Sequence, residues 1–423
     1  MAFQQIQWIV NSLALLGFTP LPALAQIVPD RTLPVNSNVS SDCSNCTITG
    51  GTVRGANLFH SFEQFSVPTG GSAYFNNSLN IQNILTRITG QSASSIDGLL
   101  RTNGSANLFL INPNGIIFGS NARLNIGGSF LASTATSIKF PDGEFNTNPA
   151  QSSPLLSINV PIGLGFGSSP APIQVLGTGH LLTLQNPLLS PTIGASQSTS
   201  GLRVQAGKTI ALVGGTVSLD GGILTAPSGR VEVAAVDSGD VSLTAIPQGF
   251  ALTPGIVSGW KPIQLSNRAL LDTSGLPGGS IQINGGKVSF TEGATALIQN
   301  AGVAEAGSIE INAREQAFFS GVGFQGNSPF PSRLINESVG PGKSGNVIIS
   351  SPNLTVEAGA NISARTYGSG EGGDVILNVP SAIVVRGFSL IFPDLFSHIV
   401  AATVGAGDAG NVIATTQTLI GQD

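Results

Sequence analysis

The distal part of the chain repeats one short pattern: Gly, a polar residue, an alternating β-forming triplet, then Asn, Ser or Thr. The five copies begin at Gly279, Gly307, Gly345, Gly373 and Gly410, so the steps are 28, 38, 28 and 37 residues, or 66, 66 and 65 taken two at a time. A fixed period in a sequence of strands and glycines is typical of a solenoid. An antiparallel sandwich would not keep such a period, and a propeller blade needs about 40 to 50 residues per unit. The repeat therefore favours a parallel β-helix with one to two coils per unit.

This fold predicts where each residue type lies. Aliphatic side chains fill the interior, and Gly and Asn take corners where φ can be positive. The extra residues of the 38-residue steps should form wider loops, such as the segment from Ser320 to Pro331. We also expect Ser, Thr and Asn to stack on their equivalents one coil away, as polar ladders.

The same alternation of short strands and corners occupies the rest of the chain. In the stretch 107–133, an apolar run over 108–111 meets the turn Asn112-Pro113-Asn114-Gly115 and leaves as Ile116-Ile117-Phe118. Asn suits the first turn position, Pro pre-sets φ at the second, and Gly closes the turn. Strands and corners this closely spaced leave no room for a helix, so we predict an all-β protein. Period-2 pairs continue downstream at Leu202/Val204, Ile210/Leu212, Val217/Leu219 and Val231/Val233.

The chain carries unusually little charge. Charged residues make up 9% of the sequence, against about 25% in an ordinary domain. A globular α/β enzyme needs charged helix faces that this chain cannot supply, and regularly spaced Ile, Leu, Val and Phe exclude disorder. We expect a dry apolar interior and an exterior of uncharged polar residues. The net charge of −5, without a basic stripe, argues against nucleic acid as a partner.

The N-terminus has the features of a secretory signal. The segment from Ile6 to Leu24 is mostly apolar, and Ala23-Leu24-Ala25 is a small-x-small cleavage site. A retained membrane anchor is the alternative, and Pro20 and Pro22 disfavour it. No later segment has the roughly 20 uninterrupted apolar residues of a spanning helix. We predict a signal peptide over 1–25 and a mature chain that is exported.

Two cysteines form a C-x-x-C motif, Cys43 and Cys46. A redox pair should open a helix beside a βαβ unit, but the following 47–51 resembles strand and turn. A zinc site needs two further ligands, and the chain has no other cysteine. In an exported chain we favour a small local disulfide.

No catalytic, metal or cofactor site is predicted. His60, His180 and His398 are scattered, and neither G-x-S-x-G nor H-E-x-x-H occurs. Polysaccharide-active β-helices rely on clustered acids, which the sequence does not show. The segment 369–376 nearly matches a calcium-binding glycine repeat, but we interpret it as a Gly-rich corner because no tandem copy follows. The acids that would have to cluster are isolated along the chain: Asp220, Glu232, Asp237 and Asp240.

From about Ile27 to Ala135 the chain resembles the N-terminal secretion domain of filamentous-haemagglutinin-type exoproteins, the passengers of two-partner secretion systems. The family's best-known signature, Asn-Pro-Asn-Gly-Ile, matches without change at Asn112, Pro113, Asn114, Gly115 and Ile116. The flanking matches are His60-Ser61-Phe62-x-x-Phe65-Ser66-Val67, Ile96-Asp97-Gly98-Leu99-Leu100 and the run from Ala106 to Ile111.

The resemblance implies a right-handed parallel β-helix with an irregular, capped N-terminus. It implies export to the periplasm by a signal peptide, then passage as an unfolded chain through a partner outer-membrane β-barrel, with residues 112–116 as the secretion motif. We therefore expect a secretion domain over 26–165, a β-helix continuation over 166–250 and repeats of about 66 residues over 251–423.

For the mature protein at the cell surface or in the medium, two functions compete. One is an adhesin or surface-interaction scaffold that meets host cells, neighbouring cells or extracellular polysaccharide. The other is the stalk of a haemolysin or contact-dependent toxin whose effector module is absent. The chain stops at Asp423, just after a repeat strand, which suggests a truncated or split member, or an end that needs a partner.

Overall fold

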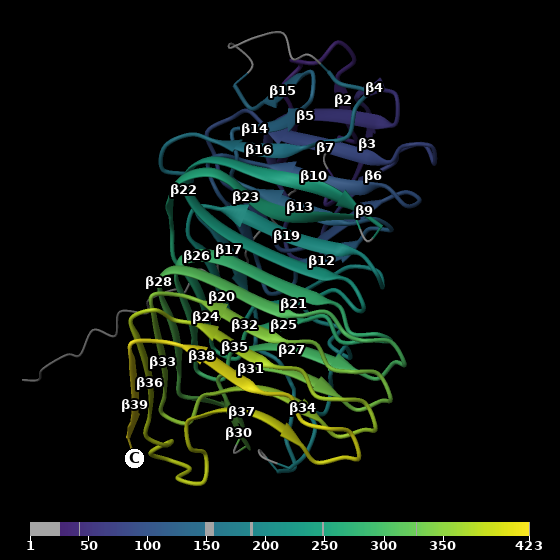
Figure 1. Ribbon diagram of the computed structural model, residues 1–423. Coiled ribbons are helices and arrows are strands. Elements are labelled where there is room, and N and C mark those ends of the chain that lie inside the picture. The colour runs from purple at the N-terminus through teal and green to yellow at the C-terminus, as the bar shows by residue number, and fades with distance from the viewer. Residues whose placement is uncertain are drawn as a thin grey trace, which may run out of the picture.

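The computed structural model describes residues 26–41, 43–148, 156–186, 189–247, 249–326 and 328–422. Every regular element in these ranges is a β-strand. The strands stack coil upon coil into a long solenoid, from the purple N-terminal end to the yellow C-terminal end in Figure 1. The chain is thus an all-β parallel β-helix, as predicted. The expected signal peptide, 1–25, lies outside the described residues.

Three stacks of parallel strands form the faces of the coil. The first contains β5 (Asn57–Ser66), β7 (Asn83–Ile88), β10 (Asn107–Ile111), β13 (Phe130–Ser133), β19 (Thr209–Gly214), β22 (Arg230–Ile246), β26 (Ser280–Thr291), β28 (Ile309–Ser320), β32 (Val347–Ser350), β35 (Val375–Asn378) and β38 (Val412–Thr415). The second contains β8 (Ser94–Ile96), β11 (Ile116–Phe118), β17 (Ile173–Leu176), β20 (Val217–Asp220), β24 (Ile263–Ser266), the later parts of β26 and β28, β33 (Asn353–Glu357), β36 (Ala382–Arg386) and β39 (Thr418–Gln422). The third contains β3 (Asn45–Gly50), β6 (Ser72–Phe75), β9 (Leu99–Thr102) and β12 (Arg123–Asn125), followed by the seven-stranded sheet β18 (Leu202–Arg203), β21 (Ile223–Thr225), β25 (Leu270–Asp272), β27 (Thr295–Asn300), β31 (Arg333–Ser338), β34 (Asn361–Thr366) and β37 (His398–Thr403).

The glycine-led repeats lie directly above one another. Ile281 pairs in parallel with Ile309, Ile309 with Val347, Val347 with Val375, and Val375 with Val412. Each copy is therefore one coil. The 38-residue step from Gly307 to Gly345 contains a hairpin of β29 (Val322–Gln325) and β30 (Ser328–Pro331). This hairpin confirms the wider loop expected there.

The repeat glycines serve a purpose other than the expected one. All five keep φ outside the left-handed region. Instead, a Cβ at Gly345 would overlap the carbonyl oxygen of Gly307, and Gly373 and Gly410 each meet the preceding glycine in the same way. These glycines are thus required because the backbones of adjacent coils approach too closely for any side chain.

The polar ladders form as predicted. The amide of Asn83 donates to Asn57 Oδ1 at 2.9 Å, and the amide of Asn107 donates to Asn83 Oδ1 at 3.0 Å. A second ladder joins Asn312 to Asn284 at 3.1 Å. The first ladder lies at the turn into the first stack, and the second lies within β26 and β28, where their first-stack parts end. Ile, Leu, Val and Phe fill the interior.

An antiparallel sheet lies outside the coil and covers part of the first stack. It contains β14 (Ser137–Phe140), β15 (Gly143–Asn146), β16 (Gly163–Phe166), the distal half of β22, and β23 (Gly249–Trp260). Its apolar side chains pack on Phe59, Leu85 and Phe109, which point outward from the first stack and so form a second core. The sequence analysis did not predict this layer.

The N-terminal segment caps the solenoid and is more regular than expected. Strand β1 (Gln26–Pro29) pairs antiparallel with β5, and β2 (Ser37–Val39) pairs antiparallel with β3. Ile27 is buried in the main core. The short β4 (Thr52–Arg54) then forms a hairpin with β5.

Charged side chains are buried as well, which the sequence analysis did not expect. They lie on outward faces of the coil strands that other segments cover. They are Arg87, Glu232, Asp272, Arg333, Glu337 and Arg365.

Candidate functional site

The predicted secretion motif forms the corner between β10 and β11. The backbone N–H of Asn112 donates to Ser133 O at 2.9 Å, which continues the pairing of β10 with β13. Gly115 N–H then donates to Asn112 O at 3.2 Å and closes the turn. The corner therefore turns the chain from the first stack into the second.

The side chains of this corner bind to the preceding coil. Asn112 is 0% exposed, and its amide donates to Ser92 O and Ser94 Oγ, each at 3.0 Å. Its Oδ1 accepts hydrogen bonds from the N–H and the side-chain amide of Asn114, at 3.0 and 3.1 Å. Asn114 in turn donates to Gly90 O at 2.7 Å. Every hydrogen-bonding atom of the Asn112 amide is thus used within the protein.

The other motif residues complete the turn without forming a recognition surface. Gly115 has φ of 113°, which disfavours any residue with a Cβ. Ile116 is buried in the lumen and pairs in parallel with Ser94 and Ile173. Only Pro113, with Asn114, remains half-buried. In the folded chain the motif is a structural corner.

Cys43 and Cys46 are joined by a disulfide. The bridge closes a short loop that ends at the start of β3. Cys46 is buried in the main core, near its N-terminal end. The segment that follows is a strand and not the helix that a redox motif would open.

The three histidines occupy separate environments. His60 is buried on β5 between Phe62 and Phe75, and its Nδ1 is hydrogen-bonded to Ser37 Oγ at 2.9 Å. Burial lowers the pKa of His60 to about 3. Burial likewise lowers the pKa of His180 and of His398 to about 4 each. His60 and His180 are therefore packed, neutral residues at ordinary pH, and His398 is half-buried and also neutral.

The acids are paired or separate. In the outer sheet, Asp240 lies 2.6 Å from Lys139 Nζ, and Asp237 lies 2.7 Å from Lys261 Nζ. Glu232 lies 2.7 Å from the Arg230 guanidinium, and burial raises its pKa to about 7. Among the residues that the structure describes, no group of His, Cys, Asp or Glu is arranged to hold a metal ion.

Two further features bear on the sequence expectations. At the calcium-like segment, a Cβ at Gly370 or Gly373 would overlap the carbonyl oxygens of Gly342 and Gly345. These glycines pack against the coil beneath, as a Gly-rich corner does.

Within the described ranges, no helix is long and apolar enough to span a membrane.

Sequence reasoning missed a polar cluster centred on Arg87. Its guanidinium donates to Ser61 Oγ and to Thr32 Oγ1, each at 2.8 Å, and to Asn146 O, and it lies 4.6 Å from the Phe145 ring centroid. The cluster therefore joins the N-terminal cap, the coil and the outer sheet. The only sequence signal was one Arg within the otherwise uncharged strand β7.

Asp30 supports the same cluster. It accepts hydrogen bonds from Ser61 Oγ at 2.5 Å and Thr89 Oγ1 at 2.6 Å. Burial by itself would raise the pKa of Asp30, but the hydrogen bonds from Ser61, Thr89 and Thr32 outweigh it and the pKa is lowered.

Residues 25–289 match the family model of the TPS secretion domain. The chain belongs to this family: it is an exoprotein of the filamentous haemagglutinin type, from a two-partner secretion system. The match extends beyond residue 165, the predicted end of the secretion domain. Because a family match gives the extent of similarity and not the domain boundaries, the three predicted boundaries stay predictions.

Two solved structures are similar to this chain. The secretion domain of HMW1 from Haemophilus influenzae matches at a TM-score of 0.50 and 16% identity, over 95% of this chain and all (100%) of that one. A filamentous hemagglutinin secretion domain matches at a TM-score of 0.40 and 14% identity, over 92% of this chain and 99% of that one. At these identities the first likeness supports the fold alone. No curated protein sequence gave a significant match.

Proposed function

We propose that the chain is exported across the periplasm and through the outer-membrane β-barrel of its two-partner system. A signal peptide over 1–25 directs the first step, and the mature protein ends in the medium or on the cell surface. Membership of the TPS secretion-domain family supports this route.

The observation that carries the role of the motif is the complete burial of Asn112. A partner cannot bind an amide whose donors and acceptor are all used inside the protein. We infer that residues 112–116 act before the coil around them closes, while the segment is still extended. A barrel pore also passes an extended chain more readily than a folded solenoid. Coils that fold outside then bury apolar surface at roughly 25 cal/mol per Å² and bias movement outward.

The test is the double variant Asn112→Ala with Asn114→Ala. We expect it to reach the periplasm at normal levels and to be absent from the medium and the cell surface. Immunoblots of the periplasmic, cell-surface and medium fractions measure this distribution. Undiminished release of the double variant contradicts a role of the motif in export.

A matched control separates recognition from simple destabilisation. Asn300 and Asn336 are also fully buried, and their amides donate to Ala304 O at 2.8 Å and Gly307 O at 2.9 Å. Both lie beyond the family match. Asn300→Ala with Asn336→Ala should lower the free energy of unfolding comparably yet leave release intact. If both double variants are retained equally, the motif acts through stability alone.

For the released protein we propose a surface-interaction role as an adhesin-type scaffold. Side chains on the outer face of the second stack lie in register and are accessible across six coils. Such a continuous face suits contact with a host cell, a neighbouring cell or an extracellular polysaccharide. The residues are Gln264, Ser289, Phe318, Thr355, Val384 and Ile420.

This role is tested with the purified chain on intact cells and on immobilised polysaccharide. We expect saturable binding that weakens in Phe318→Ala with Val384→Ala and persists in Leu276→Ala, an exposed residue on the opposite part of the coil. Binding that is absent, or that both variants retain, contradicts a role of this face and favours a stalk that carries an effector module.

A further inference from the structure

A long excursion between β17 and β18 runs along the outside of the seven-stranded sheet. We call it the strap, residues 178–186 and 189–200. Its two limbs are joined by reciprocal hydrogen bonds between the backbones of Thr183 and Ile193, at 3.1 and 3.0 Å. In Figure 1 this teal segment passes beside coils coloured green to yellow, which follow it by many residues in sequence.

The returning limb is held by side chains that point outward from successive coils. Ser196 N–H donates to Asp272 Oδ2 on β25 at 2.6 Å, and Thr192 N–H donates to Glu337 Oε1 on β31 at 2.9 Å. Gln299 on β27 donates to Thr192 O at 2.8 Å. Beyond β34, Tyr367 donates to Ser190 O at 2.9 Å. The strap residues in these contacts use backbone atoms, so one extended segment is tied to four consecutive coils.

The outgoing limb is anchored by polar and apolar contacts. His180 is hydrogen-bonded to Gly293 O at 3.0 Å, and the Arg268 guanidinium donates to His180 O at 2.7 Å. Leu182, which is 4% exposed, packs in a cluster with residues of four of the coils. The other members of that cluster are Ile223, Leu270, Leu297, Phe330 and Ile335.

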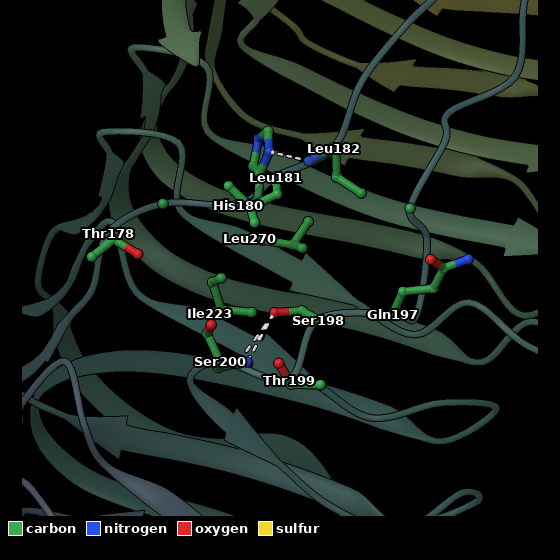
Figure 2. Close-up of a pocket in the computed structure, with 12 residues that line it drawn as sticks. Thr178, His180, Leu181, Leu182, Gln197, Ser198, Thr199, Ser200, Ile223 and Leu270 are labelled. Carbon is green, nitrogen blue, oxygen red and sulfur yellow. Dashed lines mark hydrogen bonds between the residues drawn. The ribbon is translucent and has the colours of Figure 1, made fainter. Parts of the chain in front are cut away.

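Both limbs also border one cavity. Between them lies a cavity of about 240 Å³. Figure 2 shows His180 and Leu182 on one side of it, Gln197 to Ser200 on the other, and Ile223 with Leu270 between them. The limbs are thus positioned by the sheet beneath them.

We propose that the strap is a clamp that docks late and couples the coils from β21 to β34 into one cooperative unit. Each coil of a solenoid otherwise contacts only its neighbours, so its stability is a sum of local terms. The strap adds contacts between coils that do not touch. Its docking surface is made of residues 223–367, so it cannot dock until β34 is in place, whatever the route of export.

The first test removes the apolar anchor. In the full chain, Leu182→Ala should raise hydrogen-exchange rates of the β25, β27 and β31 amides by about tenfold or more, because the lost burial loosens the clamp over all of them. The control is Leu181→Ala, because Leu181 is 69% exposed and its truncation should leave exchange unchanged. Faster exchange confined to the strap itself in Leu182→Ala would show a passive cover and overturn the proposal.

The second test measures the order of docking. Pulsed hydrogen exchange during refolding of the full chain reports on the amides of Thr192 and Ser196, which are bonded to sheet carboxylates. We expect both to become protected only after the ladder amides of β31 and β34. Protection of these two amides before β34 forms contradicts late docking.

Discussion

Asn107 donates its side-chain amide to Asn83 Oδ1 at 3.0 Å, although the two residues lie on different coils. Asn83 passes the same interaction on to Asn57. The ladder thus connects three coils at the turn into the first stack. It satisfies polar groups that the packed coils remove from water.

Asn83→Ala should therefore destabilise the N-terminal coils. It leaves a buried acceptor on Asn57 without its partner, at a cost of about 1 to 3 kcal/mol, and a half-buried donor on Asn107 whose loss costs less. Urea denaturation gives the free energy of unfolding. The comparison is Asn378→Ala, whose exposed bond to Ser350 is 3.4 Å long and whose loss should cost under about 0.5 kcal/mol. Equal losses for both variants would contradict a special role of the buried ladder.

Arg87→Met should destabilise the N-terminal cap by about 3 kcal/mol or more, as expected when one partner of a buried charged cluster is removed. The substitution keeps an apolar side chain against Phe145 but leaves Asp30 without its nearby cation. Denaturation and limited proteolysis at the N-terminal segment measure the effect. Arg101→Met is the matched control. The guanidinium of the exposed Arg101 stacks over the Tyr74 ring at 4.4 Å, and the loss of this interaction should cost about 0.5 to 1 kcal/mol.

The pH dependence of stability should reveal the buried histidines. Burial lowers the pKa of His60 from 6.5 to about 3. Between these values the unfolded chain binds a proton that the folded chain does not, so stability rises with pH across this window and is lost as pH falls. One such group contributes a slope of about 1.4 kcal/mol per pH unit. His60→Gln should remove one such slope between pH of about 4 and 6 in denaturation series. An unchanged slope would mean that His60 is protonated in the folded chain.

Local pattern predicted the coil well, for a physical reason. Period-2 alternation and glycine corners are set by each strand and its neighbours one coil away, so the repeats, the turn at residues 112–115 and the ladders could all be inferred. The buried placement of Asn112 is consistent with that turn chemistry.

The outer layers were missed because they depend on contacts that leave no local period. Leu85 and Arg87 alternate with core residues as any exposed strand residue would, and only the folded chain shows what covers them. The strap is a Pro- and Ser-rich segment whose partners lie far downstream in the sequence. Ser196 and Asp272 are 76 residues apart, and Thr192 and Glu337 are 145 residues apart. Such a pairing is invisible to spacing rules.

The repeat glycines allow the sharpest test of the coil geometry. Gly345 has ordinary φ, so conformational strain alone predicts that alanine is tolerated there. The structure predicts the opposite, since the new methyl group would overlap Gly307 O, which is backbone and can move only if the two coils separate. Overpacking of this kind costs about 1 to 3 kcal/mol and more where the backbone must shift. We expect Gly345→Ala to lower the urea midpoint and to raise hydrogen exchange in β28 and β32 together. Gly421→Ala is the control, because a Cβ there meets no atom of the described chain within 4 Å. If Gly345→Ala matches the control, the adjacent coils are farther apart than the structure shows.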